Sequence, residues 1–202
     1  MDTREKLLRA GEAIARRDGL RRLTVRGVAT RAQVNLGSFV YHFGAREHFV
    51  AELIERLYAP MFQRLALSAE AAGDPLTRLA AVLRQLLAWL VQERGFIAHL
   101  LLDAGAGEAA AQRFLQSMDQ RHPALLLALI VQAQAEGRLA RGDPRHQMLF
   151  LMGSLALPVV MLHMGAERGV LPPALASAFT TLTTEPDALD TRLAWALKGL
   201  AP

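Results

Sequence analysis

The side chains best suited to binding a ligand gather in residues 24–46. Ser38, Tyr41 and His42 bring two hydroxyl groups and an imidazole close together, and Arg26 and Arg46 lie on either side of them. Hydroxyl and ring N–H groups donate hydrogen bonds to phosphate oxygens and base edges, and guanidinium groups neutralise phosphates. This pattern favours contact with nucleic acid.

Catalytic chemistry finds little support in the sequence. The six histidines, at positions 42, 48, 99, 122, 146 and 163, form no zinc-binding motif, and the absence of cysteine excludes thiolate metal sites and a cysteine nucleophile. Ser38 and His42 share a helical face, but no nucleophile elbow surrounds Ser38. Gly105-Ala106-Gly107 lacks the third glycine of a phosphate loop. We therefore expect no enzymatic activity, no metal and no cofactor.

The basic charge is concentrated at the N-terminal end of the chain. Residues 1–46 carry ten basic and four acidic side chains, a balance of +6, so the remaining residues sum to −2 within the net charge of +4. Such an asymmetry indicates a segment that binds a polyanion attached to a nearly neutral body. A solvated basic face explains the charge alone equally well.

The elements that position these side chains are expected to be helices. Alanine and leucine dominate, while only 6% of residues are aromatic, which predicts an all-α fold. Apolar spacing predicts a helix over residues 3–17, a short helix after Thr24 and another from Asn35 to Phe43, with Thr24 and Asn35 as N-caps. A short helix, a tight turn and a second short helix form the helix-turn-helix that places its second helix in the DNA major groove.

The rest of the chain continues the helical pattern. We expect a long helix from Arg46, kinked at Pro60, and about nine helices in total, with loops around Pro172, Pro173 and Pro186. Further helices are predicted over residues 75–93, 96–102, 108–121, 123–137 and 188–200. Residues 146–166 carry no charged side chain, so this segment is long enough to span a membrane. Its histidines, Ser154 and Pro158 favour instead a helix that packs within its own domain and against a partner chain.

Residues 24–46 resemble the DNA-binding segment of the TetR family of transcriptional regulators. The family begins its second helix with Thr-Val-Arg, writes its third helix as V-S-x-G-T-L-Y-x-H-F, and follows it with a basic residue. Here these elements read Thr24-Val25-Arg26, then residues 34–43 as VNLGSFVYHF, then Arg46. Gln33 replaces the usual turn glycine, which costs about 1 kcal/mol if the residue is left-handed. Gly27 replaces the usual acidic residue of a capping box.

The resemblance implies a DNA-binding domain over residues 1–46 and a ligand-binding and dimerisation domain over residues 47–202. It implies a homodimeric regulator, most simply a repressor, that binds a palindromic operator and is released by a small, mainly apolar effector. Gly37 would let the recognition helix approach the groove closely, and Leu36 could contact a thymine methyl group. The implied DNA-binding residues are Thr24, Arg26, Asn35, Leu36, Gly37, Ser38, Tyr41, His42 and Arg46.

The C-terminal region is expected to hold the effector pocket and the dimer interface. By resemblance, the helices over 146–166 and 188–200 pair with those of a second subunit, and small residues on the first allow close approach. The interface residues are Gly153, Ser154, Leu157, Met161, Leu193, Trp195 and Leu197. The pocket candidates are Met61, Phe62, Trp89, His99, Met118, Phe150 and Met152, although for each of them a place in the hydrophobic core is the simpler interpretation.

Two other interpretations stay open at this stage. One is a helical metabolite-binding or interaction module whose basic N-terminal segment contacts RNA, a membrane surface or a protein. The other is membrane anchoring through residues 146–166. The N-terminus carries Asp2 and Glu5 and spaced apolar residues, unlike a targeting peptide, so we expect a cytoplasmic protein without membrane association.

Overall fold

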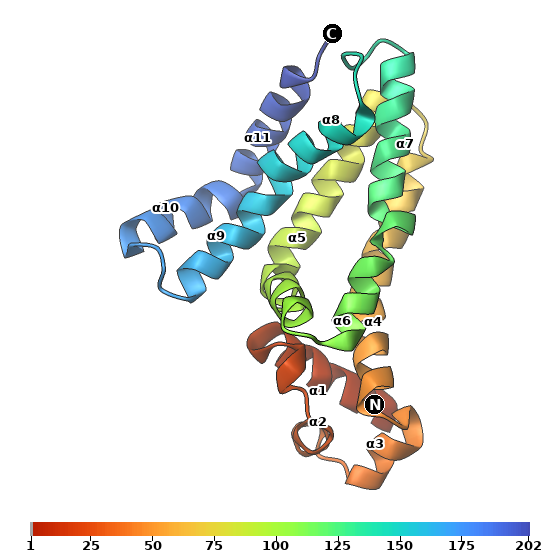
Figure 1. Ribbon diagram of the computed structural model, residues 1–202, viewed down its shortest axis with the longest axis vertical. Coiled ribbons are helices and arrows are strands. Elements are labelled where there is room, and N and C mark those ends of the chain that lie inside the picture. The colour runs from red at the N-terminus through yellow and green to blue at the C-terminus, as the bar shows by residue number, and fades with distance from the viewer. Residues whose placement is uncertain (1) are drawn as a thin grey trace. The chain divides into compact units, whose positions relative to one another are not determined.

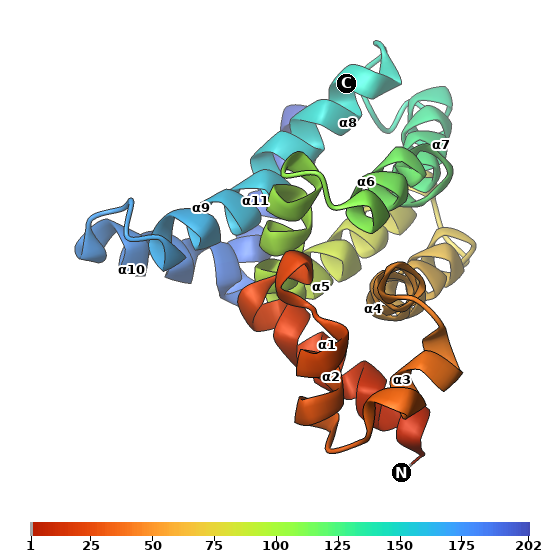
Figure 2. The same ribbon diagram turned by 60° about the horizontal axis from the view of Figure 1, so that its bottom comes forward.

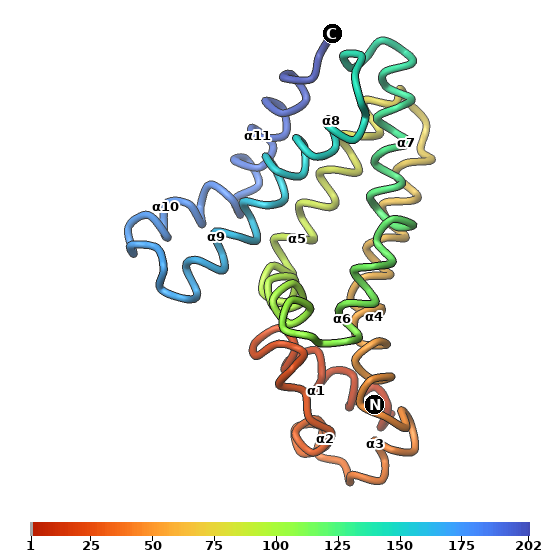
Figure 3. The backbone as a smooth tube through the Cα atoms, viewed as in Figure 1, coloured from red at the N-terminus to blue at the C-terminus, as the bar shows by residue number. Residues whose placement is uncertain are grey.

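The computed structural model describes residues 2–202, and all regular structure among them is helical. This confirms the predicted all-α class. Among residues 2–202 there are eleven α-helical segments, two of which are joined through a π-helix into one continuous run, so the number of separate helices is close to the nine expected. Figure 3 traces the path of the chain. The residues group into two compact units, residues 1–60 with 95–117 (unit 1) and residues 61–94 with 118–202 (unit 2).

Unit 1 contains the N-terminal helices and a segment from the middle of the chain. In Figures 1 and 2, α1, α2 and α3 lie against one another near the N-terminus. The first part of α4 and the last part of α5 complete this unit together with α6. The elements are α1 (Thr3–Asp18), the 3₁₀ helix η1 (Leu20–Arg22), α2 (Val25–Ala32), α3 (Leu36–Phe43), α4 (Arg46–Ala69), α5 (Pro75–Gly105) and α6 (Ala109–Gln116).

The core of unit 1 is built on three phenylalanines. The ring centroids of Phe39 and Phe49 are 5.0 Å apart, and those of Phe43 and Phe49 are 4.8 Å apart. Gly11 on α1 allows this packing, because a Cβ atom there would lie 2.5 Å from the Phe49 ring. Val28, Ala29, Phe39 and Phe43 are buried as predicted for this core, whereas Val34 is half-buried.

The boundary expected between residues 46 and 47 does not match the division into units. The helix α4 begins at Arg46 and continues through Pro60, and its first residues Phe49, Val50 and Leu53 are buried. Because Phe49 packs on the phenylalanines of α3, the start of α4 belongs to the same compact unit as α3. The division between the units falls after Pro60 instead.

Unit 2 comprises the rest of α4 and α5 and the C-terminal helices. The predicted end of a helix at Glu93 corresponds to a non-helical residue inside α5, with φ −104° and ψ 15°. The expected helix over 108–121 ends at Gln116. The other elements are η2 (Met118–Gln120), α7 (His122–Ala135), α8 (Pro144–Leu151), the π-helix η3 (Met152–Ala156), α9 (Leu157–Glu167), α10 (Pro173–Thr184) and α11 (Pro186–Gly199).

The expectation of loops around Pro173 and Pro186 is wrong. Pro173 begins α10 and Pro186 begins α11. Proline is tolerated in the first turn of a helix, because its fixed φ is already helical and its missing N–H would have no partner there. The prolines therefore mark helix starts in this region.

Candidate nucleic-acid interface

The start of α2 and the turn after it have the geometry predicted from the sequence. The Thr24 hydroxyl accepts a hydrogen bond from the Gly27 N–H at 3.0 Å, so Thr24 is the N-cap. Gln33 ends α2 with φ 55° and ψ 45°, the left-handed conformation that glycine adopts most readily. This residue turns the chain into α3.

The start of α3 is fixed by Asn35 and Ser38. Asn35 Oδ1 accepts hydrogen bonds from the Ser38 N–H at 2.8 Å and from the Ser38 hydroxyl at 2.9 Å. The hydroxyl proton of Ser38 is therefore directed to Asn35 rather than to His42. The serine oxygen keeps its capacity to accept a hydrogen bond from a base or to contact a backbone group.

The face of α3 away from the core is exposed and unusually apolar. Tyr41 is 85% exposed, Val40 54% and Leu36 48%. His42 is half-buried, and its ring lies edge-on to that of Tyr41 with the centroids 5.0 Å apart. Exposed apolar side chains beside a tyrosine hydroxyl have the chemistry needed to contact a thymine methyl group and to form a hydrogen bond with DNA.

Gly37 lies on this exposed face and is not required by the fold. An added Cβ atom would meet only Asn35 Oδ1, at the ordinary contact distance of 3.4 Å. Its backbone φ is not positive, so conformation does not demand glycine either. What glycine provides here is an open backbone surface at the start of α3.

Arg46, expected to contact phosphate, is directed into unit 1. Its Nε donates to the Leu23 carbonyl at 2.6 Å, and its Nη2 donates to the Leu20 carbonyl at 2.7 Å and to Glu108 Oε2 at 2.8 Å. Its side chain is 25% exposed, and that of Glu108 is 7% exposed. Because these contacts occupy its donors inside unit 1, we expect Arg46 not to contact DNA phosphate directly.

Ion pairs within unit 1 reduce the number of basic side chains that are left to bind a polyanion. Five of the ten basic side chains in residues 1–46 pair with an acid, at 2.5 Å for Arg4 and Glu52 and at 2.7 Å for Arg17 and Asp18. Hydrogen bonding from Arg17 lowers the pKa of Asp18, with smaller effects from His99 and Arg22. Among the described residues, no ion pair is formed by Lys6, Arg21, Arg22, Arg26 and Arg31, all of which are exposed. Arg26 and Arg31 lie on α2.

The pocket candidates fall into both units. Met61 and Trp89 are buried in unit 2, while Phe150 is 46% exposed. His99 belongs to unit 1, where a Cβ atom added to Gly19 would lie 3.1 Å from its Nδ1. Phe62, Met118 and Met152 are half-buried. Three cavities formed by described residues of unit 2 are lined by other side chains.

The expected interface residues lie on α9, α11 and the π-helix η3. Trp195 is 69% exposed, Leu157 54% and Met161 51%. Gly153 is exposed and Ser154 and Leu197 are half-buried, whereas Leu193 is buried inside the protomer. The Ser154 hydroxyl donates to the Phe150 carbonyl at 2.7 Å, and the Ser154 carbonyl accepts from the Arg192 guanidinium.

Sequence reasoning did not identify Asp103 and Glu108, two acids at the junction of α5 and α6. Asp103 Oδ2 accepts from the Leu20 N–H at 2.6 Å and from the Arg21 N–H at 3.3 Å. The contacting residues are 83 and 82 positions away along the chain. Of these two acids, Glu108 is the one that is unusual in being buried. The sequence, in which Glu108 simply follows Gly107, gives no sign of that burial.

Unit 1 therefore contains two short helices joined by a tight turn, the helix-turn-helix arrangement that DNA-binding proteins use. Residues 7–53 match the family model described as bacterial regulatory proteins, tetR family. The chain is 29% identical over 138 residues to the HTH-type transcriptional repressor NemR of Escherichia coli K12, covering 68% of this chain and 69% of that protein. No group of three or more histidine and acidic side chains that could hold a metal occurs among residues 2–202.

Solved structures extend the similarity of fold to nearly the whole chain. The ketosteroid transcriptional regulator KstR2 of Mycobacterium tuberculosis has a TM-score of 0.73 at 20% identity, covering 100% of this chain and 96% of that one. FadR of Bacillus subtilis, solved in complex with stearoyl-CoA, has a TM-score of 0.66 at 14% identity, covering 91% and 98%. The match to the tetR family model therefore covers the helix-turn-helix and the helices beside it, and the solved structures share the fold of nearly the whole chain.

Proposed function

We propose that the chain is a cytoplasmic repressor that binds a palindromic operator as a homodimer and is released by a small, mainly apolar effector. The observation that carries the proposal is the outer face of α3, where Leu36, Gly37, Val40 and Tyr41 are exposed without serving the core. Thr24, Arg26 and Ser38 lie beside them. Together these side chains have the chemistry to contact bases and phosphates in a DNA major groove. No catalytic role is proposed.

Exposed apolar side chains in unit 2 support the homodimer. Leu149, Phe150, Leu157, Met161 and Trp195 lie on the run from α8 to α9 and on α11, each at least 46% exposed. A second copy of the chain would remove these side chains from water. Two-fold symmetry would then present two α3 helices to half-sites about 34–36 Å apart.

The helical run Pro144–Glu167 is long and apolar enough to cross a membrane by length and composition, with 22% of its apolar window buried. Within unit 2, however, Arg192 from α11 donates to backbone carbonyls of η3 in the middle of this run. A guanidinium is costly in hydrocarbon, which favours a protein partner over lipid. Recovery of the protein in the membrane pellet after a high-salt wash would contradict this interpretation.

An apolar effector is supported by unit 2 and by a structural neighbour. FadR binds stearoyl-CoA in its solved structure. Unit 2 contains a cavity of about 310 Å³ between α5 and the C-terminal helices, whose apolar lining includes Leu87, Val91, Leu189 and Leu193. The buried Met61 and Trp89 remain candidates for contact with the effector at a second place in unit 2.

Changing the exposed face of α3 should weaken operator binding without unfolding the protein. We expect Gly37→Ala and Tyr41→Ala each to weaken binding to the operator, a site selected from the protein's own upstream DNA, by about tenfold. This corresponds to the loss of roughly one good hydrogen bond or close contact. Fluorescence anisotropy measures the affinity. Gly142→Ala, the same change at an exposed site in unit 2, and Leu67→Ala, which truncates another exposed apolar side chain there, should leave the affinity unchanged.

The same assay tests the effector and the alternative function. A neutral steroid and stearoyl-CoA serve as probes, and release of DNA by one of them supports an apolar effector. Binding that shows neither sequence preference nor loss with salt would contradict the repressor. Preference for RNA over the DNA duplex would favour the interaction-module interpretation instead.

A further inference from the structure

The turn between α5 and α6 carries two carboxylates and is held tightly by its own backbone. The Glu108 N–H donates to the Asp103 carbonyl at 2.8 Å, and the Ala106 N–H donates to the Leu102 carbonyl at 2.9 Å. Gly107, with φ 92°, supplies the conformation that closes the turn. The Asp103 and Glu108 side chains are therefore presented by one small, rigid element.

Asp103 binds the N-terminal end of η1. Its Oδ2 accepts from the backbone N–H groups of Leu20 and Arg21, at 2.6 Å and 3.3 Å. Gly19 makes this approach possible, because a Cβ atom there would lie 2.7 Å from that oxygen and its φ is 89°. A carboxylate that accepts two backbone N–H groups in a partly buried place fixes their position firmly.

Glu108 binds the other end of η1 through Arg46. The two Glu108 oxygens accept from Arg46 Nη1 at 3.3 Å and Nη2 at 2.8 Å. The same guanidinium donates to the Leu20 and Leu23 carbonyls. Glu108 precedes the first residue of α6 but makes no side-chain capping bond to that helix, so its carboxylate is committed to Arg46.

We propose that Asp103, Glu108 and Arg46 form a clamp that positions the N-terminus of α2 for DNA binding. Leu23, whose carbonyl Arg46 holds, directly precedes Thr24, the N-cap of α2. We expect the clamp residues themselves not to contact DNA. They are positioning residues for Thr24 and Arg26, and the inference rests on the proposed function.

A purely electrostatic effect of these acids predicts a change in DNA affinity of the opposite sign. Removing an acid from a protein that binds a polyanion strengthens binding by electrostatics. Loss of the clamp should weaken binding, because η1 and the start of α2 gain freedom that DNA must then remove. The sign of the change therefore separates positioning from charge.

The variants are Asp103→Asn and Glu108→Gln, with Glu47→Gln as the control. Glu47 is an exposed acid in the first turn of α4, also within unit 1. We expect each clamp variant to bind the operator about tenfold more weakly than wild type, and the control to bind as tightly or slightly more tightly. The double variant should be little weaker than the weaker single variant, because both changes release the same turn.

Hydrogen exchange provides the second measurement on the same full-length proteins. The Leu20 and Arg21 amides should exchange faster in Asp103→Asn while the melting temperature stays close to that of wild type. If both clamp variants bind the operator as the control does, the clamp is overturned, and if Glu108→Gln does not fold, Asp103→Asn decides alone. If wild type binds no selected DNA, the proposed function fails. Unchanged exchange at Leu20 and Arg21 would then reject the clamp separately.

Discussion

At the scale of single residues, Gln33 departs most clearly from what its backbone position favours. Its left-handed conformation costs an L-residue about 1 kcal/mol or more, and no other described non-glycine residue has a positive φ. The turn between α2 and α3 keeps this strain. The Val34 N–H donates to the Ala29 carbonyl at 3.0 Å across this turn, and Phe39 and Phe43 of the following helix pack on Phe49 of α4.

Replacing Gln33 with glycine should stabilise the protein slightly. Relief of the left-handed strain contributes about 1 kcal/mol, and the greater freedom of glycine in the unfolded chain offsets part of it. We expect a net gain of about 0.5 kcal/mol in the free energy of unfolding, measured by urea denaturation. Gln63→Gly, in the exposed interior of α4, should instead lower stability. A loss of stability in Gln33→Gly would contradict the strain argument.

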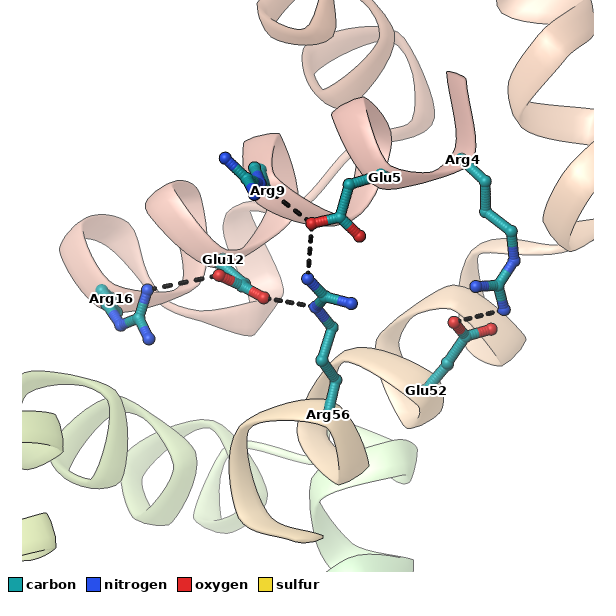
Figure 4. Close-up of polar contacts among 7 residues, drawn as sticks. All are labelled: Arg4, Glu5, Arg9, Glu12, Arg16, Glu52 and Arg56. Atoms are coloured by element: carbon teal, nitrogen blue, oxygen red, sulfur yellow. Dashed lines mark hydrogen bonds and ion pairs between the residues drawn. The ribbon is translucent and has the colours of Figure 1, made fainter. Parts of the chain in front are cut away.

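At the scale of elements, an ion-pair network joins α1 to α4 inside unit 1 (Figure 4). Arg56 of α4 donates to Glu12 at 2.6 Å and to Glu5 at 2.7 Å, and Arg4 donates to Glu52 at 2.5 Å. Hydrogen bonding from Arg9 lowers the pKa of Glu5, and Arg56 adds to this lowering, while partial desolvation opposes it. In this network, basic side chains of α1 bind acidic residues of unit 1, so we do not expect them to contact DNA phosphate.

Arg56→Gln should lower stability and weaken its dependence on pH. Because the folded pKa of Glu5 lies below its usual 4.5, its stabilising effect is present above that pH and is lost as the pH falls through the folded value. We expect a loss of stability at neutral pH, kept small by solvent screening, and a smaller loss below pH 4.5. Denaturation at both pH values measures it. Arg64→Gln, on the same helix and exposed, should show neither effect.

Sequence patterns predicted the elements far better than the contacts between distant segments. The N-caps Thr24 and Asn35 and the break at Glu93 are local features, so spacing and residue type revealed them. The start of α10 at Pro173 was missed because proline either ends or begins a helix. Arg46 was assigned to phosphate by resemblance, whereas its partner Glu108 lies 62 positions away, beyond the reach of any local pattern.

At the scale of the whole molecule, the proposed dimer can be tested at a position that the protomer leaves open. A Cβ atom at Gly153 would meet nothing within 4 Å, so Gly153→Arg should fold as wild type does. In a close helix pair, however, the added charge has no partner, and we expect the protein to sediment as a monomer and lose operator binding. Gly142→Arg adds the same charge at another open site.

That control should remain a dimer in the same sedimentation experiment. An unaltered dimer in Gly153→Arg would place the interface elsewhere on unit 2. A monomeric wild type would reject the homodimer itself, while leaving the contacts within unit 1 unaffected.

Unit 1 is built from two segments of the chain that are synthesised at different times. Residues 1–60 emerge from the ribosome well before residues 95–117, yet both belong to the same compact unit. A nascent chain that ends before Asp103 has helices α1 to α3 but no carboxylate for the Leu20 and Arg21 amides, and no Glu108 for Arg46. If Asp103, Glu108 and Arg46 position α2 as proposed, the surface proposed to contact DNA is completed only after more than half of the chain has been translated, and we expect unfinished chains to bind an operator more weakly than the complete protein.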